Sequence, residues 1–272
     1  TLIDNGAKVT DKPPLTPMYF AVTSGRADVV SALIKHKAEL NPRGGVGPLV
    51  WATFNGRPTV VRALLEGGAA AQPNTRYQSA LHVAAFGSFA DMRCPKHVTP
   101  DVRLDIAKQL IDKGADVNAK ANVGYFIDST PLVCAAMNGH LEIVKLLLEK
   151  GAEVNVASTK GMFSGYSGLH GAAEAGHKNV VKLLLERKAN INALTGKKNF
   201  KGVRTPLDLA KDAQVRELLI QHGGKKQSNR VVGWPFQAVT RPFPVSTAWK
   251  GHPTNHVPIP MLTSFHSLLL TA

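Results

Sequence analysis

A recurring helix–turn–helix pattern constrains this chain more than any other feature of its sequence. Its clearest copy covers residues 130–155 and reads TPLVCAAMNGHLEIVKLLLEKGAEVN. Thr130 followed by Pro131 is typical of a helix start, because proline at the first helical position loses no hydrogen bond. Gly139 and Gly151 predict the ends of two helices, since glycine readily adopts the left-handed conformation of a helix cap. The second helix is apolar on more than one face, so it must be covered on both sides.

Five further stretches repeat this unit in the same order. Each begins with a helix-start signal and leads into an apolar stretch; the starts are Thr16, Gly47, Ser79, Ser167 and Thr205. The first four pass through small residues and glycine, and the last is shortened and has no glycine there. One unit cannot bury its apolar surface alone, whereas stacked neighbours form a continuous core. The pattern resembles the ankyrin repeat, a unit of about 33 residues with a T-P-L-H-x-A signature. The resemblance implies an all-α ankyrin-repeat solenoid of helix–turn–helix repeats with hairpin-like fingers between them.

The expected domain boundaries follow from these starts. Residues 1–10 match the end of a truncated repeat, so we expect an upstream part that is absent from the sequence. The third repeat contains an insertion over 88–98, after which Thr99 and Pro100 predict a new helix start. Residues 225–272 contain six prolines, five Lys or Arg and no Asp or Glu, which predicts a basic, disordered C-terminal tail. The six expected repeats cover 11–42, 43–72, 73–119, 120–156, 157–193 and 194–224.

Charge and cysteine content limit the function classes. The net charge of +14 favours acidic partners and permits weak, salt-dependent binding of nucleic acid. The two cysteines, Cys94 and Cys134, cannot form a disulfide framework, so an intracellular, reducing compartment (cytoplasm or nucleus) is expected. No apolar run reaches the ~18 residues of a membrane span, so we expect no membrane association. We also expect a monomer.

The sequence contains no pattern that predicts catalysis. It lacks a phosphate loop, a dinucleotide fingerprint, a G-x-S-x-G elbow and an H-E-x-x-H zinc motif. Cys94 and His97 have C-x-x-H spacing, but no second pair lies near them, so we expect neither a metal nor another cofactor. His82 and His170 hold the histidine position of the signature, where the resemblance implies a structural hydrogen bond to the serine three residues earlier.

The resemblance also places a set of side chains in the concave groove of the solenoid. Each of them comes either directly after the histidine position of the signature or shortly after the small residues that follow it. Most are aromatic; the set is Phe20, Trp51, Phe54, Val83, Phe86 and Met137. Grouped, exposed aromatic side chains mark interaction sites, so we expect an apolar protein-binding groove. The alternative is that these side chains pack against their own fingers or against the insertion over 88–98.

The expected fingers combine basic and aromatic side chains. This mixture suits an acidic, extended peptide, which charge would steer and aromatic side chains would anchor. It could also stack the bases of single-stranded nucleic acid, or each aromatic side chain could pack against the next finger. The residues are Arg43, Arg76, Tyr77, Lys120, Tyr125, Phe126, Lys160, Phe163, Tyr166, Lys197, Lys198, Phe200 and Lys201.

The resemblance also predicts roles for two asparagines and backbone strain at two lysines. Asn118 and Asn155 end the loops after second helices, where this residue stabilises the hairpin through hydrogen bonds from its side chain to the backbone. Both also resemble the sites that asparaginyl hydroxylases modify in ankyrin repeats. Lys37 and Lys188 replace the usual glycine at the end of a second helix, which predicts backbone strain and early fraying of those repeats.

These observations predict a non-enzymatic adaptor or scaffold that binds another protein through its groove and its fingers. The expected partner carries an acidic or extended segment. Two alternatives stay open: a nucleic-acid-associated regulator that uses the basic surface, and the recognition arm of a larger enzyme whose catalytic domain lies upstream.

Overall fold

The structure, a computed structural model, describes residues 16–42, 46–71, 79–89, 92–93, 95, 97–123, 126–159, 164–196 and 202–227. Within these ranges twelve helices follow one another as six pairs. The pairs are α1 (Pro17–Ser24) with α2 (Ala27–Lys35), α3 (Pro48–Phe54) with α4 (Pro58–Glu66), α5 (Ala80–Phe86) with α6 (Pro100–Asp112), α7 (Pro131–Met137) with α8 (Leu141–Glu149), α9 (Gly168–Ala175) with α10 (Lys178–Glu186), and α11 (Pro206–Leu209) with α12 (Ala213–Gln221).

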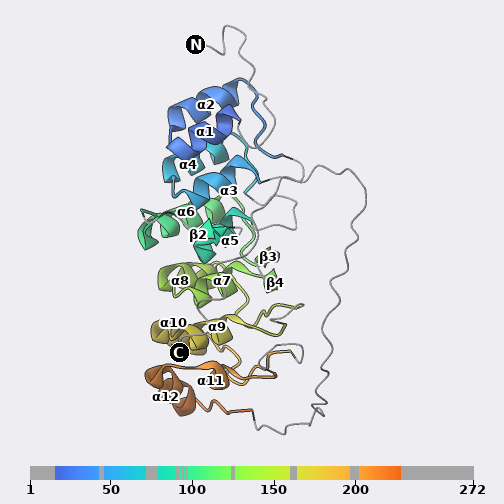
Figure 1. The fold of residues 1–272 in the computed structure, drawn as a ribbon, viewed down its shortest axis with the longest axis vertical. Coiled ribbons are helices and arrows are strands. Elements are labelled where there is room, and N and C mark those ends of the chain that lie inside the picture. Colours follow the sequence, from blue (N-terminus) through green and yellow to red (C-terminus); the bar gives the residue numbers. More distant parts are fainter. Residues whose placement is uncertain are drawn as a thin grey trace, which may run out of the picture. The chain divides into compact units, whose positions relative to one another are not determined.

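The six pairs stack in chain order, as Figure 1 shows. Each first helix contacts the first helix of the next pair, from α1 to α11, and the second helices do the same from α2 to α12. The predicted all-α ankyrin-repeat solenoid is therefore confirmed for the described residues. The predicted truncated repeat over 1–10 lies outside the described residues, as does the predicted tail beyond residue 227.

Helices begin and end where the local signals predict. The Thr130 side chain accepts a hydrogen bond from the backbone N–H of Val133, and Pro131 occupies the first turn of α7. Gly139 after α7 and Gly151 after α8 have φ angles of 71° and 90°. A residue with a Cβ atom adopts this left-handed conformation only at a cost, which explains glycine at both helix ends.

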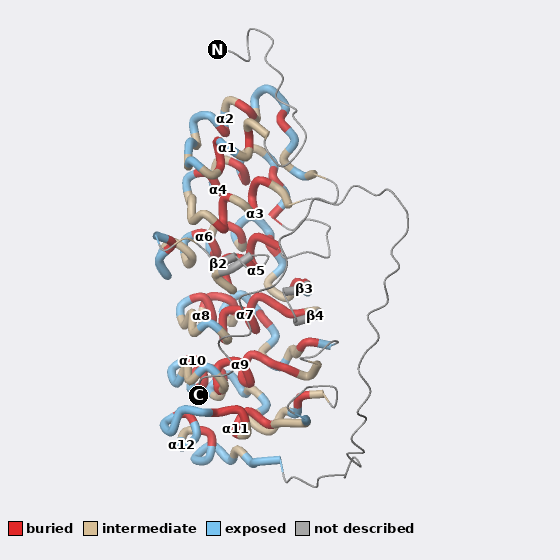
Figure 2. The backbone as a smooth tube through the Cα atoms, viewed as in Figure 1, coloured by how far each residue is buried: buried red, intermediate tan, exposed pale blue. Residues whose placement is uncertain are grey.

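The core lies between successive helix pairs. In α8, Ile143, Val144 and Leu147 are at most 2% exposed, which confirms that the second helix is covered on both sides. In Figure 2 the first helices α7 and α9 are buried along most of their length. Ala135 and Ala136 are among these buried residues, and their small side chains allow neighbouring helix backbones to approach closely.

Two short hairpins accompany the described helices. In the predicted insertion, β1 (Ser88–Phe89) pairs antiparallel with β2 (Met92–Arg93). In the finger before α7, β3 (Ala121–Val123) pairs antiparallel with β4 (Phe126–Ser129). The next finger contains an antiparallel bridge between Ala157 and Ser167.

The end of the insertion packs against the preceding repeat. Val98 is 6% exposed and lies against Gly56, where an added Cβ atom would be 2.6 Å from a methyl group of Val98. His97 Nε2 donates a hydrogen bond to the Asn55 carbonyl at 3.0 Å. The Thr99 side chain then caps α6, as predicted. The insertion therefore helps to join the second and third repeats.

Candidate protein-binding surface

Aromatic side chains join the first two described repeats. The Tyr19 ring lies 5.5 Å from the Trp51 ring, and the Trp51 ring lies 6.1 Å from the Phe54 ring, both nearly perpendicular. Phe20 meets Tyr19 edge-on at 5.8 Å. Such pairs contribute about 0.5–1.5 kcal/mol each beyond area burial. These rings therefore stabilise the packing of α1 against α3.

The structure corrects two of the predicted groove residues. Val83 is completely buried and Phe54 is 8% exposed, so neither presents much surface to a partner. Val83 is the fourth residue of its first helix, a position that faces the preceding repeat. At Gly171, the same position of α9, an added Cβ atom would lie 2.2 Å from Cγ of Met137 in α7. Stacking of the repeats therefore closes this position, which belongs to the contact between repeats.

Phe20 and Trp51 occupy the same fourth position in α1 and α3. Trp51 is half-buried, and its ring packs against Tyr19 of the preceding repeat. Phe20 is 54% exposed, since no helix pair precedes α1 in the described part of the chain. Phe20 thus lies on the first face of the described stack and not in the predicted groove.

Like the fourth residue, the seventh residue of the first helix in each repeat forms a series of equivalent positions along the stack. Because each first helix contacts the first helix of the next repeat, we infer that these side chains follow the same side of the solenoid. From α3 to α9, three of these side chains are only partly buried, and the fourth, Phe54, is buried. We define this series as the groove row: Phe54, Phe86, Met137 and Glu174.

Polar neighbours of the groove row are bonded to their own helix. The side-chain amide of Asn55 donates to the Trp51 carbonyl at 2.9 Å, and the amide of Asn138 donates to the Cys134 carbonyl at 2.9 Å. These donors already have acceptors within the chain. One donor of each amide is therefore engaged within its own helix.

Tyr166 was expected to contact a partner, but the structure buries it at 3% exposure. Its hydroxyl donates to a carboxylate oxygen of Glu174 at 2.7 Å, and its ring stacks on His170 at 5.5 Å. Burial, together with the negative charge of Glu174, raises the pKa of the Tyr166 phenol. Tyr166 therefore fixes its finger to α9 of its own repeat. The alternative stated for the finger aromatics, packing against the next finger, differs from this contact.

The remaining predicted finger residues are only partly described. Lys120 is exposed, and Phe126 lies in β4, where the backbone is described. The rest lie outside the described residues: Arg43, Arg76, Tyr77, Tyr125, Lys160, Phe163, Lys197, Lys198, Phe200 and Lys201.

The two signature histidines connect each repeat to the next finger. His82 Nε2 lies 3.0 Å from the Ser129 carbonyl oxygen, which can only accept, so Nε2 donates and Nδ1 accepts from the Ser79 hydroxyl at 2.8 Å. His170 likewise contacts Ser167 Oγ through Nδ1 and donates through Nε2 to the Ala193 carbonyl at 3.1 Å. This confirms the predicted serine bonds and adds a contact between repeats.

Burial keeps both imidazoles neutral at pH 7. It lowers the pKa of His82 and of His170 to about 4, although backbone carbonyls partly oppose the shift. Each ring already has a partner at both nitrogens. The histidines therefore have a structural role.

Asparagine side chains form a second set of bonds between repeats. The Asn118 amide nitrogen donates to the Gly151 carbonyl at 3.1 Å, and its oxygen accepts from the Glu153 N–H at 2.9 Å. Asn155 repeats this geometry with Lys188 and Asn190, at 3.4 and 2.7 Å. The sequence predicted side-chain bonds to the backbone but not that they cross to the next repeat. Hydroxylation of Asn118 and Asn155 stays a prediction.

Cys134 is buried, and burial raises the pKa of its thiol to about 12. The thiol is therefore protonated and inaccessible. Among the described residues, no cluster of three or more His, Cys, Asp or Glu side chains could hold a metal ion. None of the described helices has the length and apolar character needed to cross a membrane.

Lys37 and Lys188 adopt the left-handed conformation that their positions require. Their φ angles are 61° and 62°, whereas the corresponding Gly114 and Gly151 have 86° and 90°. For a residue with a Cβ atom this conformation costs about 1–2 kcal/mol. The predicted backbone strain is therefore present at both lysines, and the early fraying of their repeats stays a prediction.

Replacing Lys188 by glycine is expected to raise the free energy of unfolding by about 1 kcal/mol, because the strain is removed. Urea unfolding followed by circular dichroism measures this change. Arg187→Gly is the matched control: Arg187 has a φ of −90°, so glycine there only adds freedom to the unfolded chain and should destabilise. Equal effects of the two substitutions would contradict the assignment of strain to Lys188.

Comparisons with known proteins agree with this architecture. A family model described as ankyrin repeats (3 copies) matches residues 1–77, 71–158 and 99–195. The crystal structure of the human ASB11 ankyrin repeat domain is similar, with a TM-score of 0.64 and 24% identity over 82% of this chain and 91% of that chain. At this level of identity the similarity concerns the fold. No curated protein matched the chain.

Proposed function

Because the chain belongs to the ankyrin repeat family, whose members generally serve as protein–protein interaction modules, we propose that it is a non-enzymatic adaptor or scaffold. The partner is a protein segment that lies in an extended conformation along the groove row. Its apolar side chains contact Phe86 and Met137, beside the half-buried Trp51. Acidic residues of the partner face the basic fingers, in keeping with the net charge of +14.

The observation that supports this proposal most is the partly exposed apolar surface on consecutive first helices. Phe86 and Met137 occupy the same position in α5 and α7, which are in contact. The neighbouring Asn138 amide is engaged within its own helix. A partner would therefore gain mainly from apolar burial, which yields about 25 cal/mol per Å².

Phe86→Ser combined with Met137→Ser should weaken the binding of a protein partner at least tenfold, since truncating a central apolar contact costs about 1–2 kcal/mol. The partner is first recovered by affinity capture with the full chain, and its affinity is then measured by isothermal titration calorimetry. Ile220→Ser is the matched control, because Ile220 is an equally apolar residue that is 54% exposed on α12.

Thermal unfolding must show that both variants are folded at the assay temperature. Unchanged affinity of the folded double variant, or an equal loss in the Ile220→Ser control, would contradict the proposed binding surface.

The net charge also supports a second candidate function, the nucleic-acid-associated regulator. Fluorescence anisotropy with single-stranded oligonucleotides across a salt series separates the two functions. If the chain is a protein-binding module, we expect its affinity for the oligonucleotides to be weak, to fall steeply as the salt concentration rises, and not to depend on their sequence. Tight, sequence-dependent binding at physiological salt would favour the regulator.

A further inference from the structure

The exposed serine and threonine side chains differ in where they lie. Among the residues whose side chains the structure describes, they are Ser24, Ser31, Thr59, Thr99 and Thr159. The first three belong to α1, α2 and α4, and Thr99 caps α6. Thr159 instead lies in the finger between α8 and α9, and Ser158 beside it is only 1% exposed. Thr159 is therefore the exposed hydroxyl side chain in the described part of the fingers.

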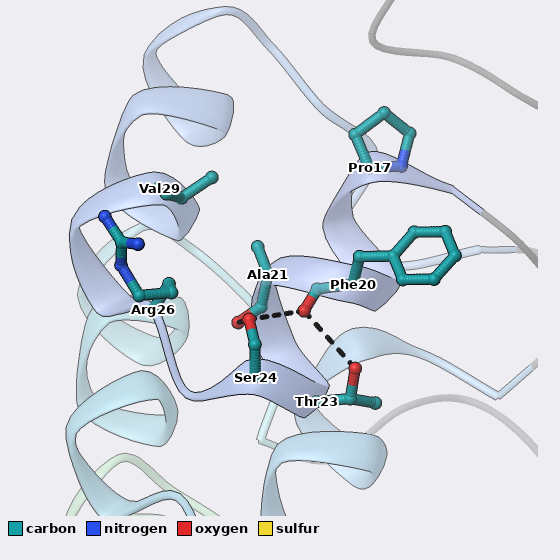
Figure 3. A pocket seen from close by; sticks show the side chains of 7 residues that line it. All are labelled: Pro17, Phe20, Ala21, Thr23, Ser24, Arg26 and Val29. Carbon is teal, nitrogen blue, oxygen red and sulfur yellow. Dashed lines mark hydrogen bonds between the residues drawn. The ribbon is translucent and has the colours of Figure 1, made fainter.

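The hydroxyls on α1 and α2 are bonded to their own helices. In the shallow depression of Figure 3, the Ser24 hydroxyl donates to the Phe20 carbonyl at 2.6 Å. The Ser31 hydroxyl donates to the Ala27 carbonyl at 2.9 Å. An enzyme that modifies either hydroxyl must first open a turn of its helix, because the helical backbone holds both residues.

The Thr159 hydroxyl makes a different kind of contact, because its acceptor lies in another finger. It donates to a carboxylate oxygen of Asp128, which belongs to β4 in the finger before α7. The finger that carries Thr159 is also bonded to itself. The Ser158 N–H donates to the Tyr166 carbonyl at 3.1 Å, and the Ser164 hydroxyl donates to the carbonyl of residue 159 at 3.2 Å. The bond between Thr159 and Asp128 therefore joins two separate fingers.

Asp128 is held in an uncommon backbone conformation. Its φ angle of 59° is left-handed, which residues other than glycine seldom adopt, although aspartate and asparagine tolerate it best. Such outliers persist where the surrounding structure over-determines a residue, and they cluster at switch regions. The bond from Thr159 is one such constraint, since it fixes the Asp128 carboxylate against the next finger. The contact thus combines an accessible hydroxyl with a constrained carboxylate acceptor.

We propose that Thr159 is a phosphorylation site and that its phosphate releases the finger between α8 and α9 from the finger before α7. The phosphoryl donor is ATP bound to a protein kinase. Thr159 Oγ1 forms a bond to the terminal phosphorus, and the bond from that phosphorus to the bridging oxygen breaks, so that ADP leaves. The hydroxyl proton passes to the catalytic aspartate of the kinase.

The phosphate replaces an attraction between the two fingers by a repulsion. It carries about two negative charges at pH 7, and the threonine oxygen has lost the proton that it donated to Asp128. A phosphate placed beside a carboxylate disrupts the contact, because like charges repel. The released finger also carries Tyr166, whose hydroxyl is bonded to Glu174 of the groove row. Phosphorylation therefore acts beside the proposed binding surface, but the release of the finger does not depend on which partner that surface binds.

Phosphorylation of the folded chain tests the site. The full chain is incubated with magnesium ATP and each of a panel of purified serine/threonine kinases, and mass spectrometry locates the phosphate. Phosphorylation at Thr159 should be at least about tenfold faster than at Ser24 or Ser31, which require local opening of a helix. A synthetic peptide of residues 154–165 is the control for sequence preference. The proposal is overturned if every kinase that modifies Thr159 in the peptide leaves it unmodified in the folded chain, or if no kinase modifies either.

Hydrogen exchange of the phosphorylated chain tests the release of the finger. The amide protons of β4 should exchange about tenfold faster after phosphorylation, the factor that corresponds to the loss of one hydrogen bond to a charged group. Asp128→Asn is the matched variant, because asparagine tolerates the left-handed conformation and its side-chain amide can donate to the phosphate. Phosphorylation of this variant should leave the exchange of β4 unchanged.

Two results of the exchange experiment would overturn the proposal. One is unchanged exchange of β4 in the phosphorylated parent chain, which pairing of the phosphate with the exposed Lys120 would produce. The other is an equal increase in the parent chain and in Asp128→Asn, because repulsion by the Asp128 carboxylate would then not be the cause.

Discussion

Acidification from pH 7 to pH 4.5 is expected to lower the free energy of unfolding by on the order of 2 kcal/mol for each of His82 and His170. Their folded-state pKa of about 4 lies below the ordinary value of 6.5. The unfolded chain therefore binds protons at a pH where the folded chain does not. The stabilisation is complete above pH 6.5 and is lost as the pH falls towards 4.

A third imidazole should act in the same direction. The pKa of His140 is also lowered to about 4, first by burial and then by electrostatic interactions with Arg103 and His177. The carboxylate of Asp28, whose pKa is lowered to about 2 by hydrogen bonding to Arg26, titrates below this window. Urea unfolding at a series of pH values measures the effect. Constant stability between pH 7 and 4.5 would contradict the burial of neutral imidazoles.

Replacing His82 by valine should lower the free energy of unfolding at pH 7 by about 2 kcal/mol, because it leaves a buried carbonyl without its donor. Valine is the least disruptive choice, since Val50 and Val133 occupy the same position in other repeats and are buried there. The lost bond joins the start of α5 to Ser129 at the end of the next finger. The variant should also have a weaker dependence of stability on pH.

His97→Ala is the matched control in the same repeat, because His97 is exposed and makes its bond to the Asn55 carbonyl at the surface. It should cost less than about 1 kcal/mol. Urea unfolding of both variants at pH 7 and 5 gives the comparison. If His82→Val kept the full pH dependence of the parent chain, the titrating group would be another residue.

The fold was predictable because its signals are local. Thr130, Pro131, Gly139 and Gly151 each act within one turn of the helix end that they define, and the structure confirms them. The repetition of the unit then predicts stacking, since one helix pair cannot bury its apolar surface alone.

The groove was predicted less well because its exposure depends on neighbours distant in sequence. The fourth residue of a first helix is closed by the preceding repeat, as Val83 shows, and Phe20 is open because of its place at the first face of the described stack. The Tyr166 side chain points inward, where its hydroxyl donates a hydrogen bond to the Glu174 carboxylate. Sequence spacing alone indicates none of these contacts.

The bonds between repeats were missed for a similar reason. Asn118 bonds to Gly151 and Glu153, which lie one repeat further along the chain. The residue type predicts a bond to the backbone, but the partner is determined by how the loops of successive repeats are stacked.

Position-specific photo-crosslinking tests the proposed groove most directly. A photoreactive residue is placed at Ala175, an exposed residue next to Glu174 of the groove row, or at Lys182, which is exposed on α10 of the same repeat. With the recovered partner present, we expect crosslinks to one continuous segment of that protein from position 175 and none above background from position 182. Equal crosslinking from both positions, or crosslinking from position 182 alone, would contradict recognition through the groove.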